Sequence, residues 1–133
     1  MIVADSNLIA SLVLESEATE SARNLLAADG EWFVPCLWRY EVANIMATMI
    51  KAKRLSADTA STLLTDLNES LRAYQRDPLP EDVFDLVAAY GITGYDAQFV
   101  ALAKELHCTL YTQDRELIEK FPKLAKPFYM RTK

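Results

Sequence analysis

Apolar residues recur along the chain in two alternating patterns, one typical of buried strands and the other of helices. Short apolar runs predict strands at residues 1–5, 32–34 and 109–112, a weaker strand at 72–76 and a last strand near 128–130. Between them, longer segments with helical spacing predict helices at residues 7–14, 17–28, 37–53, 80–91, 95–106 and 115–121, and one more after Ser56.

The two central helices carry the clearest apolar faces. Their apolar residues stand at helical spacing: Trp38, Val42, Ile45 and Met49 in the first, Leu63, Leu67 and Leu71 in the second. Helix-end signals agree with the predicted bounds of the helices. Ser16 and Ser56 are good N-caps, Pro80 suits a first turn and Gly91 suits a helix end.

The alternation of strands and helices predicts the fold class. Helices that separate short apolar strands imply right-handed crossovers and a parallel sheet covered on both faces. We therefore expect an α/β protein, a three-layer α/β/α sandwich with a central parallel sheet, built as one domain over residues 1–133.

Composition and charge limit the partners and the cellular location that the sequence allows. Fourteen Lys and Arg against nineteen Asp and Glu give a net charge of −5, so any nucleic-acid partner needs a local basic patch or a bound cation. No leader and no apolar run of membrane-span length is apparent, which predicts a cytoplasmic protein with no membrane partner. Cys36 and Cys108 are in no metal-ligand spacing and are expected to be buried, reduced thiols, a disulfide being the minor alternative.

Two of the predicted strands end on an aspartate. Asp5 closes the first and Asp114 follows the strand at 109–112, so both are expected at the carboxyl edge of the sheet, where ligands bind in such folds. Two further acids, Glu41 and Asp96, lie near the starts of helices, each preceded by a tyrosine and followed by apolar residues.

Each acid taken alone has a structural explanation. Aspartate caps helix N-termini well, which would account for Asp96 and Asp114, and a glutamate early in a helix is common. Four carboxylates gathered at one edge would repel one another unless they took up protons or a cation. Oxygen ligands without His or Cys suit hard ions such as Mg²⁺ or Mn²⁺.

The stretches IVADSNLIA, VPCLWRYEVANIM, GYDAQFVALA and LYTQD resemble, in this order, the four acidic motifs of PIN-domain ribonucleases. Over its whole length the chain is similar to the VapC-type toxins of type II toxin-antitoxin systems. The resemblance implies a PIN-like fold and metal-dependent endoribonuclease activity on RNA. It also implies a homodimer and an antitoxin protein as partner.

The resemblance assigns roles to particular residues. Asp5, Glu41, Asp96 and Asp114 match the family's metal-binding acids, and Thr112 matches a hydroxyl residue that supports the site. Ser6 and Asn7 lie where the family often has small polar residues. The implied cofactor is Mg²⁺ or Mn²⁺, which would activate a bound water and stabilise the leaving oxygen.

Two other functions remain open from the residues alone. A haloacid-dehalogenase-like phosphatase would use the aspartate after strand one as nucleophile, but that family needs an acid two residues later, where this chain has Asn7. A binding module with this fold would have lost catalysis, against which the presence of all four acids argues.

Several residues outside the acid set have two interpretations. His107 is expected at a helix end in a structural role, and Arg39 and Arg115 are expected in surface ion pairs rather than on RNA phosphates. Trp38, Met46 and Met49 are expected in the core, or in a groove for a partner helix.

Overall fold

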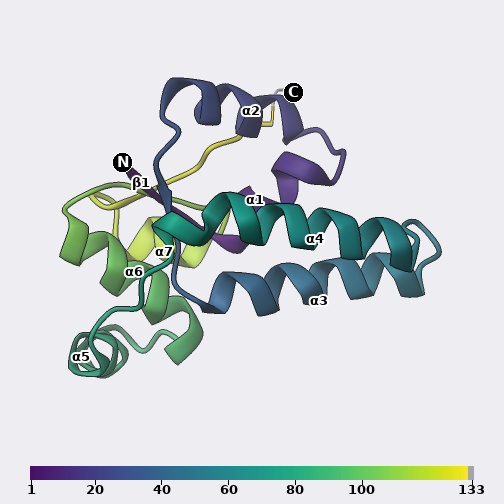
Figure 1. Ribbon diagram of the computed structural model, residues 1–133. Coiled ribbons are helices and arrows are strands. Elements are labelled where there is room, and N and C mark those ends of the chain that lie inside the picture. Colours follow the sequence, from purple (N-terminus) through teal and green to yellow (C-terminus); the bar gives the residue numbers. More distant parts are fainter. Residues whose placement is uncertain (132–133) are drawn as a thin grey trace.

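A computed structural model of the protein describes residues 1–131, so the last two residues of the predicted domain lie outside it. The elements in chain order are β1 (Ile2–Ala4), α1 (Ser6–Val13), α2 (Thr19–Ala28), β2 (Trp32–Phe33), α3 (Leu37–Lys51), α4 (Ala57–Leu71), the 3-10 turn η1 (Arg72–Tyr74), α5 (Pro80–Tyr90), α6 (Gly94–Leu106), β3 (Leu110–Tyr111), α7 (Arg115–Lys120) and β4 (Ala125–Lys126) (Figure 1).

The four strands form one parallel sheet in the order β2-β1-β3-β4. Val3 pairs with Phe33 on one side and with Leu110 on the other, which makes β1 a central strand. Strand β2 lies on one side of β1, whereas β3 and β4 lie on the other side. The order in which strands are added to the sheet therefore reverses at the boundary between β1 and β3. In open α/β sheets this reversal opens a crevice beyond the carboxyl ends of the strands.

Helices cover both faces of this sheet, which confirms the predicted three-layer α/β/α sandwich. Right-handed crossovers between parallel strands place α1 and α2 on one face and α6 and α7 on the other. Helix α6 packs directly against β1 and β3, while α1 packs against α2 and α3. Figure 1 shows α3 and α4 as two long helices side by side, whose connecting turn lies far from the sheet.

The core is made of side chains from every layer. The largest fully buried ones include Leu8 of α1, Trp32 of β2, Trp38 of α3 and Phe99 of α6. The predicted apolar face of α3 is only partly in this core. Trp38 and Val42 are fully buried, whereas Ile45 and Met49, farther along the helix, are half-buried.

Most predicted helix ends are confirmed. Ser56 caps α4 by accepting a hydrogen bond from Thr59 N at 3.1 Å, Pro80 opens α5, and Gly91 ends it in the left-handed region with φ of 66°. The prediction for α2 was wrong by two residues. Ser16 Oγ accepts from Ala18 N within a turn, and the regular helix begins at Thr19.

The strand predicted at 72–76 was wrong. η1 continues the helical course of α4 through Tyr74, and only Gln75 forms a bridge, to Val34. On either side of Gln75, Val34 N donates to Tyr74 O and Arg76 N donates to Val34 O. The segment therefore meets the edge of the sheet at one point instead of extending it.

The last strand lies earlier than predicted, at Ala125–Lys126 instead of 128–130. Pro127 follows it directly and has no N–H to continue the ladder. Residues 128 and 129 are held by a side chain instead. Gln113 Oε1 accepts from Phe128 N at 2.9 Å and Tyr129 N at 3.1 Å, and its Nε2 donates to Tyr129 O.

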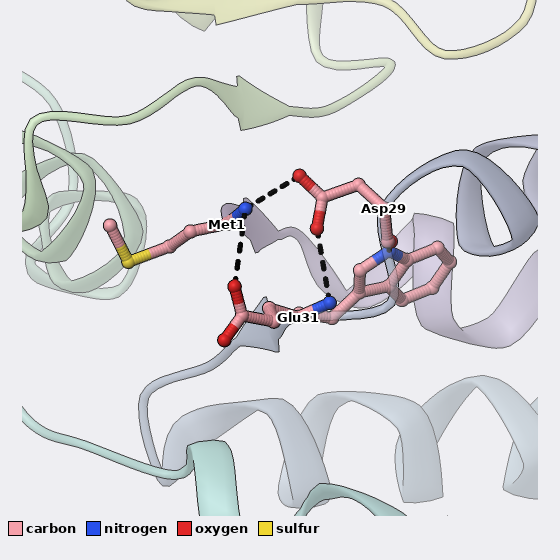
Figure 2. A network of polar contacts seen from close by, with 4 residues as sticks. Met1, Asp29 and Glu31 are labelled. Atoms are coloured by element: carbon pink, nitrogen blue, oxygen red, sulfur yellow. Dashed lines mark hydrogen bonds and ion pairs between the residues drawn. The ribbon is translucent and has the colours of Figure 1, made fainter.

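The start of β1 is fixed by a small ionic network (Figure 2). The Met1 ammonium donates to Asp29 Oδ2 at 2.5 Å and lies 3.8 Å from Glu31 Oε1, while Glu31 N donates to Asp29 Oδ1. The hydrogen bond raises the pKa of the Met1 ammonium and lowers the pKa of Asp29. The network ties the first residue to the turn that precedes β2.

Within residues 1–131, none of the helices combines the length and the apolar character needed to cross a membrane.

Candidate active site

Asp5 lies at the carboxyl end of the central strand β1, where it also caps α1. Both of its carboxylate oxygens accept hydrogen bonds, Oδ1 from Ser6 N at 2.7 Å and Oδ2 from Thr112 Oγ1 at 2.5 Å. Burial of this carboxylate raises its pKa to about 6, against the lowering effect of the Thr112 and Ser6 hydrogen bonds. Glu41 and Asp114 raise it further by repulsion.

Thr112 connects Asp5 to a second acid. It follows β3 and is completely buried, and its Oγ1 accepts from Asp114 N at 3.0 Å while donating to Asp5. Asp114 Oδ1 in turn accepts from Leu117 N at 3.2 Å, which makes Asp114 the N-cap of α7. One hydroxyl therefore holds the ends of β1 and β3 together, on the two sides of the point where the strand order reverses.

Glu41 reaches the site from the second turn of α3. Ser6 Oγ donates to Glu41 Oε1 at 2.7 Å, and Ser6 is only 5% exposed. Burial raises the pKa of Glu41, the hydrogen bond from Ser6 lowers it, and repulsion from Asp96 raises it. The first residue of α1 thus orients a carboxylate that is 35 positions away in the sequence.

Asp96 is the third residue of α6, and it does not cap that helix. Thr93 is the N-cap, since its Oγ1 accepts from Asp96 N at 3.0 Å. Burial raises the pKa of Asp96, as does repulsion from Asp114 and Asp5. The capping explanation therefore accounts for Asp5 and Asp114 but not for Asp96.

All four acids line one cavity of about 570 Å³. Four of the helices begin at this cavity, so the positive ends of α1, α3, α6 and α7 partly offset the repulsion among the carboxylates. Ser6, Asn7 and Asn44 also line it, together with the exposed rings of Tyr40 and Tyr95.

The donor chemistry of the cavity fits a hard divalent cation. Its ligand candidates are carboxylate and amide oxygens, and a cation would relieve the repulsion that raises the acid pKa values. Asn7 Oδ1 is buried and accepts no hydrogen bond from residues 1–131, so it is a further oxygen available to a ligand. In this described part of the chain, no three His, Cys, Asp or Glu side chains form a ready-made metal cluster.

The structure thus brings together all five residues singled out in the sequence: Asp5, Glu41, Asp96, Asp114 and Thr112. The hydrogen bond from Ser6 to Glu41 and the N-cap role of Thr93 were not predicted from the sequence. The spacing of Thr93 and Asp96 is a usual N-cap signal, but the contact between Ser6 and Glu41 joins two helices and has no local pattern in the sequence.

Other candidates have plainer roles. His107 ends α6 in the left-handed region, at φ of 53°, as a helix-end residue. The ion pairs predicted for Arg39 and Arg115 are absent among the described residues. Cys36 and Cys108 are free, as predicted, but both are half-buried instead of buried.

The chain is similar to known proteins over nearly its whole length. Residues 2–124 match the PIN domain. Ribonuclease VapC3 of Pyrobaculum aerophilum is 36% identical over 129 residues, which cover 95% of this chain and 98% of that protein.

Solved structures show the same fold. The crystal structure of PAE2754 from Pyrobaculum aerophilum superposes with a TM-score of 0.76 at 23% identity, covering 96% of this chain and 90% of that one. A toxin-antitoxin complex from Klebsiella pneumoniae gives a TM-score of 0.64 at 15% identity, covering 97% and 98% of the two chains. The match of residues 2–124 to the PIN domain and the 36% identity to ribonuclease VapC3 show that the chain belongs to the PIN-domain family, in its VapC-type group.

Proposed function

We propose that this protein is an endoribonuclease that hydrolyses RNA phosphodiester bonds with Mg²⁺ or Mn²⁺ at the acid cavity, as the toxin of a toxin-antitoxin pair. The observation that carries the proposal is the convergence of Asp5, Glu41, Asp96 and Asp114 on one cavity. Burial and mutual repulsion raise the pKa values of Asp5, Glu41 and Asp96. A bound divalent cation would relieve this repulsion and stabilise the charged carboxylates.

The hydrogen bonds indicate which oxygens are available to the cation. Asp5 already accepts one bond on each oxygen, which fixes its plane and leaves one lone pair on each. Among residues 1–131, no donor reaches Glu41 Oε2, Asp114 Oδ2 or either oxygen of Asp96. These atoms are the proposed ligands, with Asp5 as the fixed member of the set.

The chain's own residues orient the site for hydrolysis. A bound divalent cation would supply an activated water and charge stabilisation for the leaving oxygen. Thr112 holds Asp5 and the start of α7 in place, and Ser6 holds Glu41, so the carboxylates need little reordering when substrate binds. The cation would also compensate for the net charge of −5 where the RNA backbone approaches.

The proposed partners are an antitoxin protein and a second copy of the chain. An apolar cavity of about 330 Å³ between α1, α2 and α4 supports a protein partner, because half-buried or exposed apolar side chains such as Leu12, Leu26 and Leu63 line it. The relative from Klebsiella pneumoniae is a toxin-antitoxin complex. A cytoplasmic location remains a prediction.

The test is an RNA cleavage assay on purified protein with Mg²⁺, Mn²⁺ or chelator. Cleavage should require the metal, and Asp114→Asn should abolish it while keeping the cap on α7, because asparagine caps about as well as aspartate. Cleavage that persists in chelator would refute metal catalysis. A wild-type protein that binds RNA or a partner without cleaving would favour the alternative of a catalytically inactive binding module; membership of the PIN family disfavours the phosphatase.

A further inference from the structure

A second cavity, of about 270 Å³, adjoins the acid cavity. Asn7 and Ile45 line both cavities, which lie side by side between α1 and α3 and are together called the groove. On the α3 side, Glu41, Ile45 and Met49 follow one another at four-residue spacing and therefore lie along one face of the helix. The groove runs along this face from the acids toward the turn between α3 and α4.

Arg54 lies at the far end of the groove. Its position is set by the way α3 ends. Lys53 adopts the left-handed conformation with φ of 59°, Lys53 N donates to Ile50 O at 3.0 Å, and Arg54 N donates to Met49 O at 2.9 Å. These two bonds are those of a Schellman motif, which folds the chain back over the last turn of α3. The backbone of Arg54 is therefore fixed next to Met49 before any ligand binds.

The cavity at this end is lined by one cation, Arg54, and one acid, Glu15, which lies 3.9 Å from Arg23. Lys51, Lys53 and Arg54 are exposed at the α3–α4 turn, and none of them forms an ion pair within residues 1–131. In a chain of net charge −5, three such cations within four residues give this turn a local positive charge. The turn lies at the outer end of the hairpin in Figure 1.

We infer that this groove, from Asn7 to Arg54, holds the RNA strand that flanks the scissile phosphate, with Arg54 contacting a backbone phosphate at its far end. The inference rests on the proposed function and extends it. Glu41 and Met49 are about 12 Å apart along the helix, so the groove accommodates a few nucleotides beyond the acids. Its half-buried Ile45 and Met49 offer apolar contact to a nucleotide, and Arg54 at its end suits a phosphate.

Asn7 stands at the junction of the two cavities. Its buried Oδ1 has no donor among the described residues, and an amide offers both an acceptor and two donors. A ribose 2′-hydroxyl passing from one cavity to the other would supply the missing hydrogen bond. Asn7 is thus proposed as a positioning residue for the substrate.

The test compares RNA of two lengths. Binding of labelled oligouridylate is measured by fluorescence anisotropy on full-length Asp114→Asn protein, with a trinucleotide and with a strand of about ten nucleotides, within the usual range of single-strand sites. The longer strand should bind more tightly. Adding Arg54→Ala should weaken its binding roughly two- to fivefold and reduce the slope of log affinity against log salt by about 0.7. Binding of the trinucleotide should not change.

The matched control is Arg72→Ala, which removes the same charge from an exposed position outside the groove. It should leave both lengths unaffected. In wild-type background, Arg54→Ala should raise KM for the longer RNA and leave kcat unchanged, whereas Asn7→Ala should affect both lengths.

Two results would overturn the inference. One is a length dependence that survives Arg54→Ala. The other is a change in oligomeric state or partner binding in Arg54→Ala without any effect on RNA, which would assign the groove to protein contacts. Absence of cleavage by the wild type would refute the proposed function instead, and the binding measurements would still decide where the strand lies.

Discussion

Thr112 donates its hydroxyl hydrogen to Asp5 across 107 positions of sequence, at 2.5 Å. The same oxygen accepts from Asp114 N, so one buried side chain sets the distance between the two strand ends that carry acids. This arrangement makes Thr112 a structural part of the active site without placing it on the substrate.

Replacing Thr112 by valine tests that role at nearly constant volume. Thr112→Val leaves Asp5 Oδ2 without a donor and Asp114 N without an acceptor, both partly buried. We expect the free energy of unfolding to fall by about 1–3 kcal/mol and RNA cleavage to fall with it. Thr112→Ser should restore most of both, measured by thermal melts and by cleavage rates. Equal losses in the serine and valine variants would show that packing, not the hydroxyl, matters.

Removing the Ser6 hydroxyl should act on Glu41 alone. Without its donor, the Glu41 carboxylate keeps the burial that raises its pKa and loses the bond that lowers it. Ser6→Ala should therefore weaken Mn²⁺ binding by roughly tenfold, measured by calorimetry near neutral pH. Ser61→Ala, in α4, is the control and should bind Mn²⁺ as the wild type does. Unchanged affinity in Ser6→Ala would show that the Ser6 hydrogen bond does not support metal binding by Glu41.

Asp96→Asn separates charge from capping. Thr93 caps α6, so the substitution spares the cap and removes one repelling charge. The metal-free variant should melt higher than the metal-free wild type, and added Mg²⁺ should stabilise the wild type more than the variant. The control is Asp82→Asn, at the same third position of α5. If Asp96→Asn gains as much from Mg²⁺ as the wild type does, Asp96 holds no metal.

The stability of the chelated protein should depend on pH through Asp5. Its pKa is about 6 in the folded chain against an ordinary value of 3.8, so the folded state binds more protons than the unfolded state between these values. Stability therefore falls as pH rises from about 4 to about 6, by on the order of 3 kcal/mol for this group. Asp5→Asn should show a smaller fall in denaturant melts across the same range. A wild-type stability that rises over this range would contradict the raised pKa.

The positions of the acids could be predicted from sequence because strand ends and helix starts leave local signals. Asp5 follows a short apolar run, and Asp114 comes two residues after Thr112, at a helix start. In a parallel sheet both must lie at the same edge. The link from Ser6 to Glu41 was unpredictable, because it depends on how α1 packs against α3.

The two wrong strands have related physical reasons. Around Gln75, β-like residues meet the sheet, but the preceding helix runs on to Tyr74 and leaves room for only one bridge. Near the C-terminus, aromatic residues suggested a strand at 128–130, yet the Gln113 amide binds that backbone and the pairing with β3 occurs before Pro127. A continuing helix overrode strand propensity at the first place, and tertiary hydrogen bonding overrode it at the second.

The ionic network at Met1 bears on how the protein should be prepared for these measurements. A purification tag placed before Met1 would replace its ammonium with a neutral amide and remove the partner of Asp29, three residues from the end of β1 and four from Asp5. The added peptide would then leave the chain beside the turn between α2 and β2. Material for titrations of Asp5 should therefore start at Met1, with any tag removed.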